Sequence, residues 1–326
     1  MPKSHAIEDA LAALQGLRAD ATSPAAQKEL RLALSHKAAL VVAKAAQIVG
    51  DAELGTLTHE LVAAFERFLI HPVKTDPNCV AKTAIADTLY RLGADAGDVF
   101  LRGIRHVQME PVWGGRNDTA GSLRGVCALG LVRIGHRDAL LEISDLLADL
   151  DPRVRANAAR ALAYSENPQA ILLLRLRALV GDDPEVVGEC FAALVAIDPL
   201  SSLPFIERFL ARDDPLVQES AALALGASRL PDAFTLLRTW WEQIVQVDLR
   251  KTALLAVAMI KHDDAIDFLL QIIREGKAMD GRDAIAALAI YKHDDALVER
   301  IRKAVAQRQE VDLSAPFERM FEKPET

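Results

Sequence analysis

Apolar and small residues recur along this chain with a period of 31–32 residues. A first column of apolar residues comprises Leu123, Val154, Val186, Val217 and Leu249. Four residues further on lies a column of small residues, Cys127, Ala158, Cys190, Ala221, Ala253 and Ala284, and eight residues further on lie Leu131, Leu162, Leu194, Leu225, Val257 and Leu288. Offsets of this kind fall on one face of an α-helix, so the pattern predicts one buried helix in each repeat.

A second helix is predicted to follow in every repeat. It opens on a small residue, at Ala139, Ala170, Ser202, Ala233, Ala265 and Ala296. Apolar residues then follow at offsets of 3, 4, 7 and 8, which is typical of an amphipathic helix. After Ala265 these residues are Phe268, Leu269, Ile272 and Ile273. Each unit is thus predicted to be two helices joined by a tight turn.

Several of the first helices carry a start signal. Asp-Pro pairs stand at Asp151-Pro152, Asp183-Pro184 and Asp214-Pro215. In each pair the aspartate can accept hydrogen bonds from free backbone N–H groups, and proline has no N–H to lose in the first turn. Asp76-Pro77 is expected to open an earlier, less regular unit, and residues 35–70 to hold another.

The predicted fold is a stack of these helix pairs. One pair cannot bury two apolar faces alone, so neighbouring pairs must supply the core. We expect an all-α protein, a right-handed α-α superhelix (solenoid) of about eight helix pairs. Residues 1–34 are expected to form an N-terminal helical cap, residues 35–308 the repeats and residues 309–326 a C-terminal tail helix.

The repeat motif resembles a known family. Residues 151–162, DPRVRANAARAL, follow the pattern D-P-x-V-R-x-x-A-A-x-A-L of the short HEAT-like repeats typified by the phycobilin (PBS) lyases. The match is partial in the next two repeats, where Val187 and Gln218 replace the arginine. The resemblance covers residues 35–308 and implies a HEAT-like fold. It leaves the function open, because HEAT-like solenoids serve as adaptors, lyases, hydroxylases and DNA glycosylases.

Composition and charge exclude several classes of protein. Hydrophobic residues make up 51% of the chain but aromatic residues only 5%, which disfavours an all-β fold. The net charge of −8 disfavours a nucleic-acid binder. In addition, no continuous row of basic residues is present to contact phosphates. No segment reaches the roughly 18–20 apolar residues that a membrane span needs. We therefore expect neither nucleic acid nor membrane as a partner.

The N-terminus and the cysteines favour a cytoplasmic location. Glu8 and Asp9 stand where a signal peptide would need its apolar core. Cys79, Cys127 and Cys190 form neither a CxxC pair nor an even disulfide framework. Both features are expected of a protein in a reducing compartment.

The histidines and cysteines favour structural roles over chemistry. The string KHDDA occurs twice, but His262 and His293 lie one repeat apart, about 8–10 Å, too far to share a zinc ion easily. Its aspartates suit the N-cap of the helix that follows. Cys127 and Cys190 occupy the small column and are expected to be buried hydrophobes. We predict no catalytic residue, no metal site and no cofactor.

The pair Trp240-Trp241 aligns with core positions of other repeats. Core packing is therefore the simplest interpretation for both side chains. A second interpretation, which the sequence leaves open, places a partly exposed Trp241 at the floor of a groove.

One segment departs from the repeat period. From Val80 to Leu123 the chain runs 43 residues, about eleven more than the period elsewhere. The extra residues fall in a predicted loop at 106–122, HVQMEPVWGGRNDTAGS. Insertions in repeat proteins map to loops on one face, and such loops often carry the specific function.

This insertion holds the candidate binding residues. An aromatic beside an arginine, here Trp113 and Arg116, is typical of an interface hot spot or of a pocket for a carboxylate or phosphate. The candidate site for a partner or ligand comprises Trp113, Arg116, Arg105, His106 and Met109, with Arg102 adding to a local positive cluster. The alternative is that Trp113 tucks between two repeats and seals a widened joint.

The sequence favours a non-catalytic scaffold or adaptor that binds a protein partner through its solenoid surface. The alternative, implied by the resemblance, is a phycobilin-lyase-like enzyme or chaperone that handles a small prosthetic group. The oligomeric state stays open.

In the tail, Ser314 is predicted to cap a helix that carries an apolar stripe. The stripe comprises Leu313, Phe317, Met320 and Phe321, and it either covers the last repeat or binds a separate partner.

Overall fold

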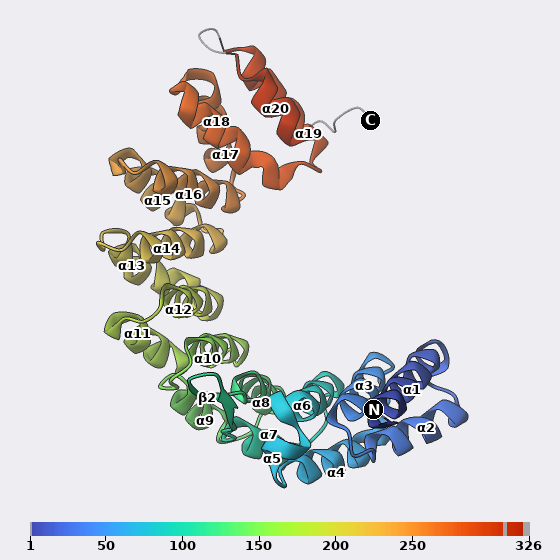
Figure 1. Ribbon diagram of the computed structural model, residues 1–326. Helices are drawn as coiled ribbons and strands as arrows, with labels where there is room; N and C mark the ends of the chain where they lie inside the picture. The colour runs from blue at the N-terminus through green and yellow to red at the C-terminus, as the bar shows by residue number, and fades with distance from the viewer. Residues whose placement is uncertain (1, 309–311, 322–326) are drawn as a thin grey trace. The chain divides into compact units, whose positions relative to one another are not determined.

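The computed structural model describes residues 2–308 and 312–321, in two compact units (Figure 1). The first unit, Met1–Ser165, contains α1 (Pro2–Leu17), α2 (Pro24–Leu34), α3 (Ala39–Asp51), α4 (Thr58–Phe68), α5 (Pro72–Thr75), α6 (Val80–Leu92), α7 (Gly97–Ile104), β1 (Met109–Val112), β2 (Gly115–Asp118), α8 (Gly121–Arg133), α9 (Ala139–Leu146) and α10 (Pro152–Tyr164), with short 3₁₀ helices η1 (Arg18–Asp20), η2 (Gly55–Leu57) and η3 (Pro77–Cys79). The second unit, Glu166–Thr326, contains α11 (Ala170–Val180), α12 (Pro184–Ile197), α13 (Pro199–Leu210), α14 (Pro215–Ala227), α15 (Pro231–Gln243), α16 (Val247–Met259), α17 (Asp263–Glu275), α18 (Ala278–Leu288), α19 (Asp295–Ala306) and α20 (Ser314–Phe321), with η4 (Ala289–Tyr291).

Within each unit the helices form two layers (Figure 1). First helices of the repeats pack on one another, as α6 packs on α3 and α8 and as α14 packs on α12 and α16, and the second helices pack against them. Every residue of the small column is fully buried: Cys127, Ala158, Cys190, Ala221, Ala253 and Ala284. The all-α solenoid fold of helix pairs predicted from the periodicity is confirmed. No described helix has both the length and the apolar character needed to cross a bilayer.

The Asp-Pro starts are confirmed in three repeats. The carboxylates of Asp151, Asp183 and Asp214 each accept a hydrogen bond from the backbone N–H two residues further on, at 2.9, 3.1 and 3.0 Å. In each case the following proline is the first residue of the helix, α10, α12 or α14. The capping carboxylates thus satisfy N–H groups that have no partner inside the helix.

The KHDDA turns also start helices, but not by the same residue. Asp294 caps α19, because its carboxylate accepts from the N–H of Leu297 at 3.0 Å. At α17 the cap is His262, whose Nδ1 accepts from the N–H of Asp264 at 3.4 Å. The predicted aspartate cap is therefore wrong for α17, where Asp263 and Asp264 lie inside the first turn. Their negative charge there is favourable at the positive end of the helix dipole.

Asp76-Pro77 precedes α6 through a less regular start than the other Asp-Pro pairs have. Pro77 belongs to η3, and α6 begins only at Val80. Asn78 and Cys79 adopt left-handed backbone conformations, with φ of 59° and 52°, which residues other than glycine rarely do. The chain kinks here, and Asp76 is completely buried, where its carboxylate accepts from the N–H groups of Ala81 and Lys82 in the first turn of α6.

The tail helix α20 lies against the last repeat. It contacts both α18 and α19. Leu313 and Phe317 are buried, so the first of the two interpretations of the apolar stripe, that it covers the last repeat, is confirmed for these residues. Met320, on the same predicted stripe, is exposed.

The start of α20 differs from the prediction. The helix begins at Ser314 itself, and the carboxylate of Asp312 accepts from the N–H of Ser314 at 2.8 Å. At the start of α20 the side chain that accepts a backbone N–H is thus that of Asp312, whereas Ser314 was predicted to cap the helix. The other residues of the predicted tail, 309–311 and 322–326, lie outside the described residues.

We expect Phe317→Ala to lower the free energy of unfolding by about 3 kcal/mol, because it removes a buried aromatic ring from beneath α20. Thermal unfolding followed by circular dichroism measures the effect. Met320→Ala on the same helix is the matched control and should change stability by less than about 0.5 kcal/mol. Equal effects of the two substitutions would show that α20 is not docked in solution.

Candidate functional site

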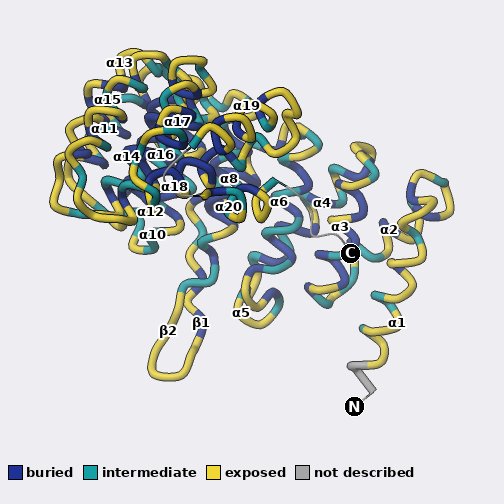
Figure 2. Tube along the Cα trace, turned by 90° about the horizontal axis from the view of Figure 1, so that it is seen from above, coloured by how far each residue is buried: buried dark blue, intermediate teal, exposed yellow. Residues whose placement is uncertain are grey.

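The insertion at 106–122 is a β-hairpin, not the predicted loop. β1 and β2 pair antiparallel, with Met109 opposite Asp118 and Val112 opposite Gly115. Trp113 and Gly114 form the turn, and Gly114 has a φ of 86° that a residue with a side chain would rarely adopt. Figure 2 shows the hairpin extending away from the helices of its unit, with exposed residues at the tip.

The hairpin presents its apolar residues to solvent. Trp113 has a relative exposure of 103%, so no part of the indole is covered. Val112 and Met109 are 50% and 40% exposed. The alternative that Trp113 seals the joint between two repeats is therefore wrong, because the hairpin holds this side chain at its tip. Large exposed aromatic side chains of this kind mark interaction sites when they stand together with other apolar groups.

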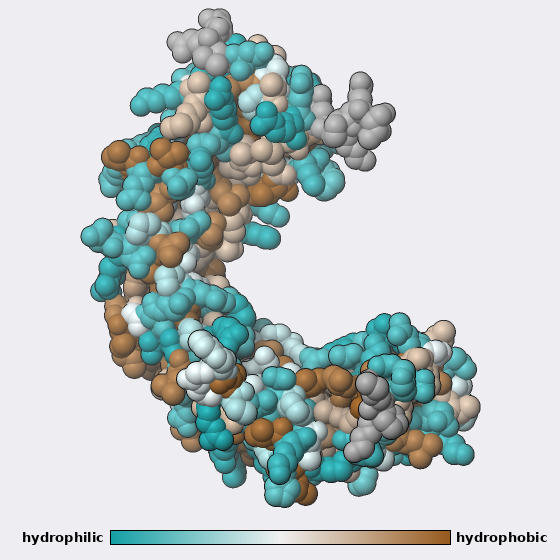
Figure 3. Space-filling model, viewed as in Figure 1, coloured by the Kyte–Doolittle hydropathy of each residue, from teal (hydrophilic) through white to brown (hydrophobic). Residues whose placement is uncertain are grey.

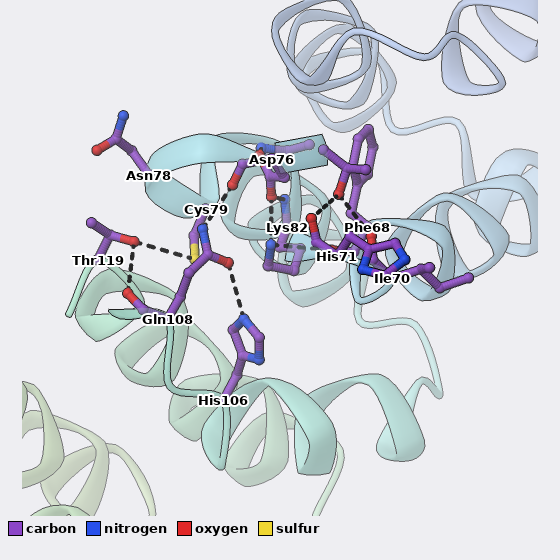
Figure 4. Close-up of polar contacts among 12 residues, drawn as sticks. Phe68, Ile70, His71, Asp76, Asn78, Cys79, Lys82, His106, Gln108 and Thr119 are labelled. Carbon is purple, nitrogen blue, oxygen red and sulfur yellow. Dashed lines mark hydrogen bonds and ion pairs between the residues drawn. The ribbon is translucent and has the colours of Figure 1, made fainter. Parts of the chain in front are cut away.

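A buried polar network fixes the base of the hairpin, and Figure 4 shows Gln108, Thr119 and Asp76, which belong to it. The carboxylate of Glu110 accepts hydrogen bonds from the N–H of Asn78, the Nε2 of Gln108 and the Oγ1 of Thr119, at 2.6, 2.7 and 2.7 Å. Burial favours the neutral acid, but these donors outweigh it and hold the pKa of Glu110 below its usual value. The network therefore ties β1 to the kink before α6 by charge-assisted hydrogen bonds.

Asp76 and Lys82 form a completely buried ion pair beside this network (Figure 4). The Nζ of Lys82 lies 2.9 Å from a carboxylate oxygen of Asp76. The same carboxylate accepts from the backbone N–H groups of Ala81 and Lys82, at 2.8 and 3.0 Å. Gln108 joins the two clusters, because its Nε2 also donates to the carbonyl of Asp76 at 2.9 Å. The hairpin base and the corner between α5 and α6 are thus one hydrogen-bonded unit.

Sequence reasoning missed this ion pair, although a signal was present. Lys82 precedes Ile85 and Ala86 by three and four residues, and both are core residues of α6. A lysine at those offsets lies on the buried face of its helix, where it needs a buried partner. Asp76 was considered from the sequence only as part of an Asp-Pro pair that opens a unit, and it was not connected with Lys82.

The predicted positive cluster is largely neutralised. Arg105 makes two hydrogen bonds to the carboxylate of Glu142, and Arg102 pairs with Glu66. His106 is half-buried, with Nε2 3.2 Å from the side-chain oxygen of Gln108, and burial lowers its pKa. Arg105 is exposed but is held by Glu142, and His106 is half-buried, so neither residue joins the tip.

Arg116 and Met109 remain with Trp113 on the hairpin. Arg116 is exposed and forms no ion pair with any other described residue. It lies directly across from Pro111, two residues along β1 from Met109. Of the five predicted site residues, the structure thus brings three together on the hairpin and leaves two at its base.

A small polar pocket lies beside the base of β2. Its volume is about 250 Å³. Its walls come from the end of β2, the kink before α6 and the first turns of α8 and α10: Asn78, Asn117, Asp118, Thr119, Gly121, Ser122, Asp151, Arg153, Val154 and Asn157. Ordinary ligand pockets hold about 300–1,000 Å³, so this one is sized for a side chain. Within residues 2–308 and 312–321, no three His, Cys, Asp or Glu side chains are grouped as a metal site would require.

Sequence comparison identifies the repeats. A family model described as HEAT repeats matches residues 115–195 and 204–290, just over half of the chain. The chain belongs to the HEAT-repeat family. No curated protein matches its sequence.

Several solved structures are similar to this HEAT-repeat chain at low identity. The complex of CpcE and CpcF of phycocyanin lyase from Nostoc sp. PCC7120 matches at 18% identity and a TM-score of 0.42, over 76% of this chain and 94% of that one. Human deoxyhypusine hydroxylase matches at 17% identity and a TM-score of 0.34, over 78% and 89%. An engineered protein matches at 18% identity and a TM-score of 0.39, over 96% and 94%.

Cys127, Cys190 and Trp240 pack in the core as predicted, whereas Trp241 is only partly buried. Cys127 and Cys190 are buried as predicted, and burial raises the pKa of both thiols, that of Cys190 to about 12. Trp240 is buried, and its Nε1 donates to the carbonyl of Leu210 at 3.1 Å. Trp241 is half-buried beneath the guanidinium of Arg250, 4.2 Å from the ring centre.

Proposed function

We propose that this HEAT-repeat protein is a non-catalytic scaffold that binds a protein partner, and that the β-hairpin of residues 109–118 is its contact element. The observation that carries the proposal is the uncovered indole of Trp113 at the tip of an anchored hairpin. A tryptophan with an adjacent exposed arginine has the composition of an interface hot spot. Val112 and Met109 would form the apolar surround of that contact.

Anchoring of the hairpin supports a binding role. Ordering a flexible loop on association costs free energy, and a contact element that is already held in place avoids much of that cost. Glu110, Gln108 and Asp76 hold the base through buried hydrogen bonds, so the tip is carried on a fixed base. A sealing element of the fold would not need an exposed tryptophan at its far end.

The state of the candidate nucleophiles supports a non-catalytic role. Burial raises the pKa of the Cys79 thiol to about 11, so the thiol stays protonated and unreactive near neutral pH. The ionisable groups under the hairpin form hydrogen bonds with neighbouring residues of the fold rather than facing an open cleft. We also propose a cytoplasmic location, supported by three cysteines that are all free thiols.

Trp113→Ala should abolish partner capture and leave stability unchanged. The side chain contacts nothing in the fold, so the melting temperature should stay within the error of the measurement. Loss of a hot-spot tryptophan is expected to cost at least about 2 kcal/mol of binding, or roughly 30-fold in Kd. Affinity purification from the producing cells, with protein identification by mass spectrometry, compares wild type with the variant.

Leu32→Ala is the matched control for capture, since this side chain is exposed at 60% on α2, away from the hairpin. Partners retained by Leu32→Ala and lost by Trp113→Ala support the proposal. Identical partner sets for wild type and Trp113→Ala would refute the hairpin as the contact element. A purified chain that carries a bound prosthetic group in stoichiometric amount would refute the scaffold role in favour of ligand handling.

A further inference from the structure

The two free edges of the hairpin are not equivalent. The N–H of Thr119 donates to the carbonyl of Gln108 at 3.0 Å, so this opposed pair is hydrogen-bonded. Because hydrogen-bonded and non-hydrogen-bonded pairs alternate in an antiparallel ladder, the pair of Pro111 and Arg116 is non-hydrogen-bonded. Backbone groups of such a pair point outward, to the free edges.

Pro111 therefore protects the edge of β1, because its outward nitrogen carries no hydrogen. On β2 the outward groups belong to Arg116 and Asp118, and both have an N–H. Neither N–H donates to any described residue outside the hairpin. In Figure 2, β1 lies on the side of α5 and β2 on the side away from it. The edge of β2 is thus open to another strand.

We infer that the occupant of this edge is β2 of a second copy of the chain, paired antiparallel about a two-fold axis at Asn117. This inference rests on the proposed function and names the protein partner of the same hairpin. The result would be a four-stranded antiparallel sheet shared between two copies. A two-fold contact uses the same surface twice, so that surface must be complementary to itself.

Charge selects the register of this pairing. Residues whose backbone N–H and C=O groups point to the free edge must lie opposite one another in the two copies. Arg116 can therefore face either Asp118 or Arg116 of the second copy. Directly opposed like charges are unfavourable and opposite charges favourable, so Arg116 faces Asp118. Asp118 keeps 23% of its side chain exposed and its pKa lies below the usual value, because hydrogen bonds from Gln108, Ala120 and Arg124 outweigh the effect of burial. Its Oδ1 already accepts two of these hydrogen bonds, but Oδ2 accepts only the one from Arg124, which leaves one acceptor position on Oδ2 for the incoming guanidinium.

The same register gives Trp113 a destination. With Arg116 opposite Asp118, the two hairpins point in opposite directions, so the tip of each copy lies beside the base of the other. Trp113, at the tip of one copy, then lies near the base of β2 of the second copy, where Gly121, Ser122 and Val154 line the polar pocket of about 250 Å³. The pocket is sized for a side chain, and the exposed indole is the side chain that reaches it.

Asn117→Cys tests the two-fold axis directly. Residue 117 would face itself in a non-hydrogen-bonded pair with Cα atoms about 4.5 Å apart, which fits a disulfide. The three native cysteines are buried and do not compete. Mild oxidation should give a covalent dimer of Asn117→Cys. Val112→Cys, at a position on β1 that is also exposed, is the matched control and should stay monomeric.

Arg116→Pro tests the open edge without removing hairpin hydrogen bonds, since the N–H of Arg116 points outward as the nitrogen of Pro111 does. Sedimentation velocity of the full chain over a range of concentrations should show a reversible dimer for wild type and a monomer for Arg116→Pro. Arg116→Glu, which would face Asp118, should weaken dimerisation by about tenfold or more. Hydrogen exchange at residues 108–112 confirms that the hairpin persists in both variants.

Wild type that sediments as a monomer throughout, or Arg116→Pro that dimerises like wild type, overturns the inference. So does equal cross-linking of Asn117→Cys and Val112→Cys. A monomeric chain that still captures another protein in a Trp113-dependent manner would overturn the second copy as occupant and leave the proposed function standing. A dimer lost in Trp113→Ala and Arg116→Pro alike supports the inference.

Discussion

Asp76→Ala is expected to lower the free energy of unfolding of the unit Met1–Ser165 by about 3–5 kcal/mol, because it leaves the ammonium of Lys82 buried without its partner. The substitution also removes the acceptor for the backbone N–H groups of Ala81 and Lys82. Lys82→Met should be destabilising by a similar amount, since it leaves the carboxylate unpaired. Chemical denaturation followed by circular dichroism measures both.

The double variant Asp76→Asn with Lys82→Met separates charge burial from hydrogen bonding. Asparagine keeps one acceptor oxygen, which can still receive the N–H of Ala81, and no buried charge remains. The double variant should therefore be more stable than either Asp76→Ala or Lys82→Met. Arg102→Met, which breaks the exposed pair with Glu66, is the control and should cost less than about 1 kcal/mol. A double variant as unstable as the sum of the singles would refute the pairing.

The same variants should loosen the hairpin. Hydrogen exchange of the amides in 108–119 should rise in Asp76→Ala, because Gln108 is bonded to the Asp76 carbonyl and the kink positions the Asn78 N–H for Glu110. Exchange in α17, in the other unit, should stay unchanged. This readout places the effect at the hairpin base rather than in the fold as a whole.

Gly226→Ala is expected to destabilise the unit Glu166–Thr326 by about 3 kcal/mol, because α14 and α16 meet there backbone to backbone. A Cβ on Gly226 would lie 2.4 Å from the carbonyl oxygen of Ala256 and 2.9 Å from its Cα. Backbone atoms cannot move aside as a flexible side chain can, so the two helices must separate. That separation loosens the buried small column formed by Ala221 and Ala253.

Gly16→Ala is the control for this prediction. A Cβ on Gly16 meets nothing within 4 Å, and alanine is the better helix former, so this variant should be unchanged or more stable by up to about 1 kcal/mol. Thermal and chemical unfolding compare the two variants. Equal behaviour of Gly226→Ala and Gly16→Ala would contradict the close helix approach.

The helix pairs could be predicted because their information is local and repeated. Apolar and small residues equivalent to Leu123 and Cys127 recur in each repeat at the spacing of one helical face, and in each repeat that face must be buried. The Asp151 and Asp183 caps follow from residues two positions apart. The cap of α17 was missed because a histidine ring can accept the same N–H bond that an aspartate accepts.

The candidate site could be predicted only in part. The extra residues of 106–122 and the pairing of Trp113 with Arg116 stand out in the sequence as a break in the period. Their arrangement as strands does not, because Pro111 and the two glycines at 114 and 115 favour an irregular loop when considered alone. Arg105 was counted as a free positive charge because its partner Glu142 lies 37 residues away in the chain.

By itself the sequence determined the repeat period, the two helices of each repeat, three of their capped starts and the position of the insertion, since each depends on residues within a few helical turns. Only the tertiary structure decided that Lys82 and Asp76 share a buried site, that Glu110 anchors β1, and that Trp113 is uncovered at a hairpin tip. The physical reason is that burial and pairing of charged groups depend on which distant segments exclude water from them. Spacing along the chain specifies a helix face, whereas the environment of a charge is set by what packs against that face.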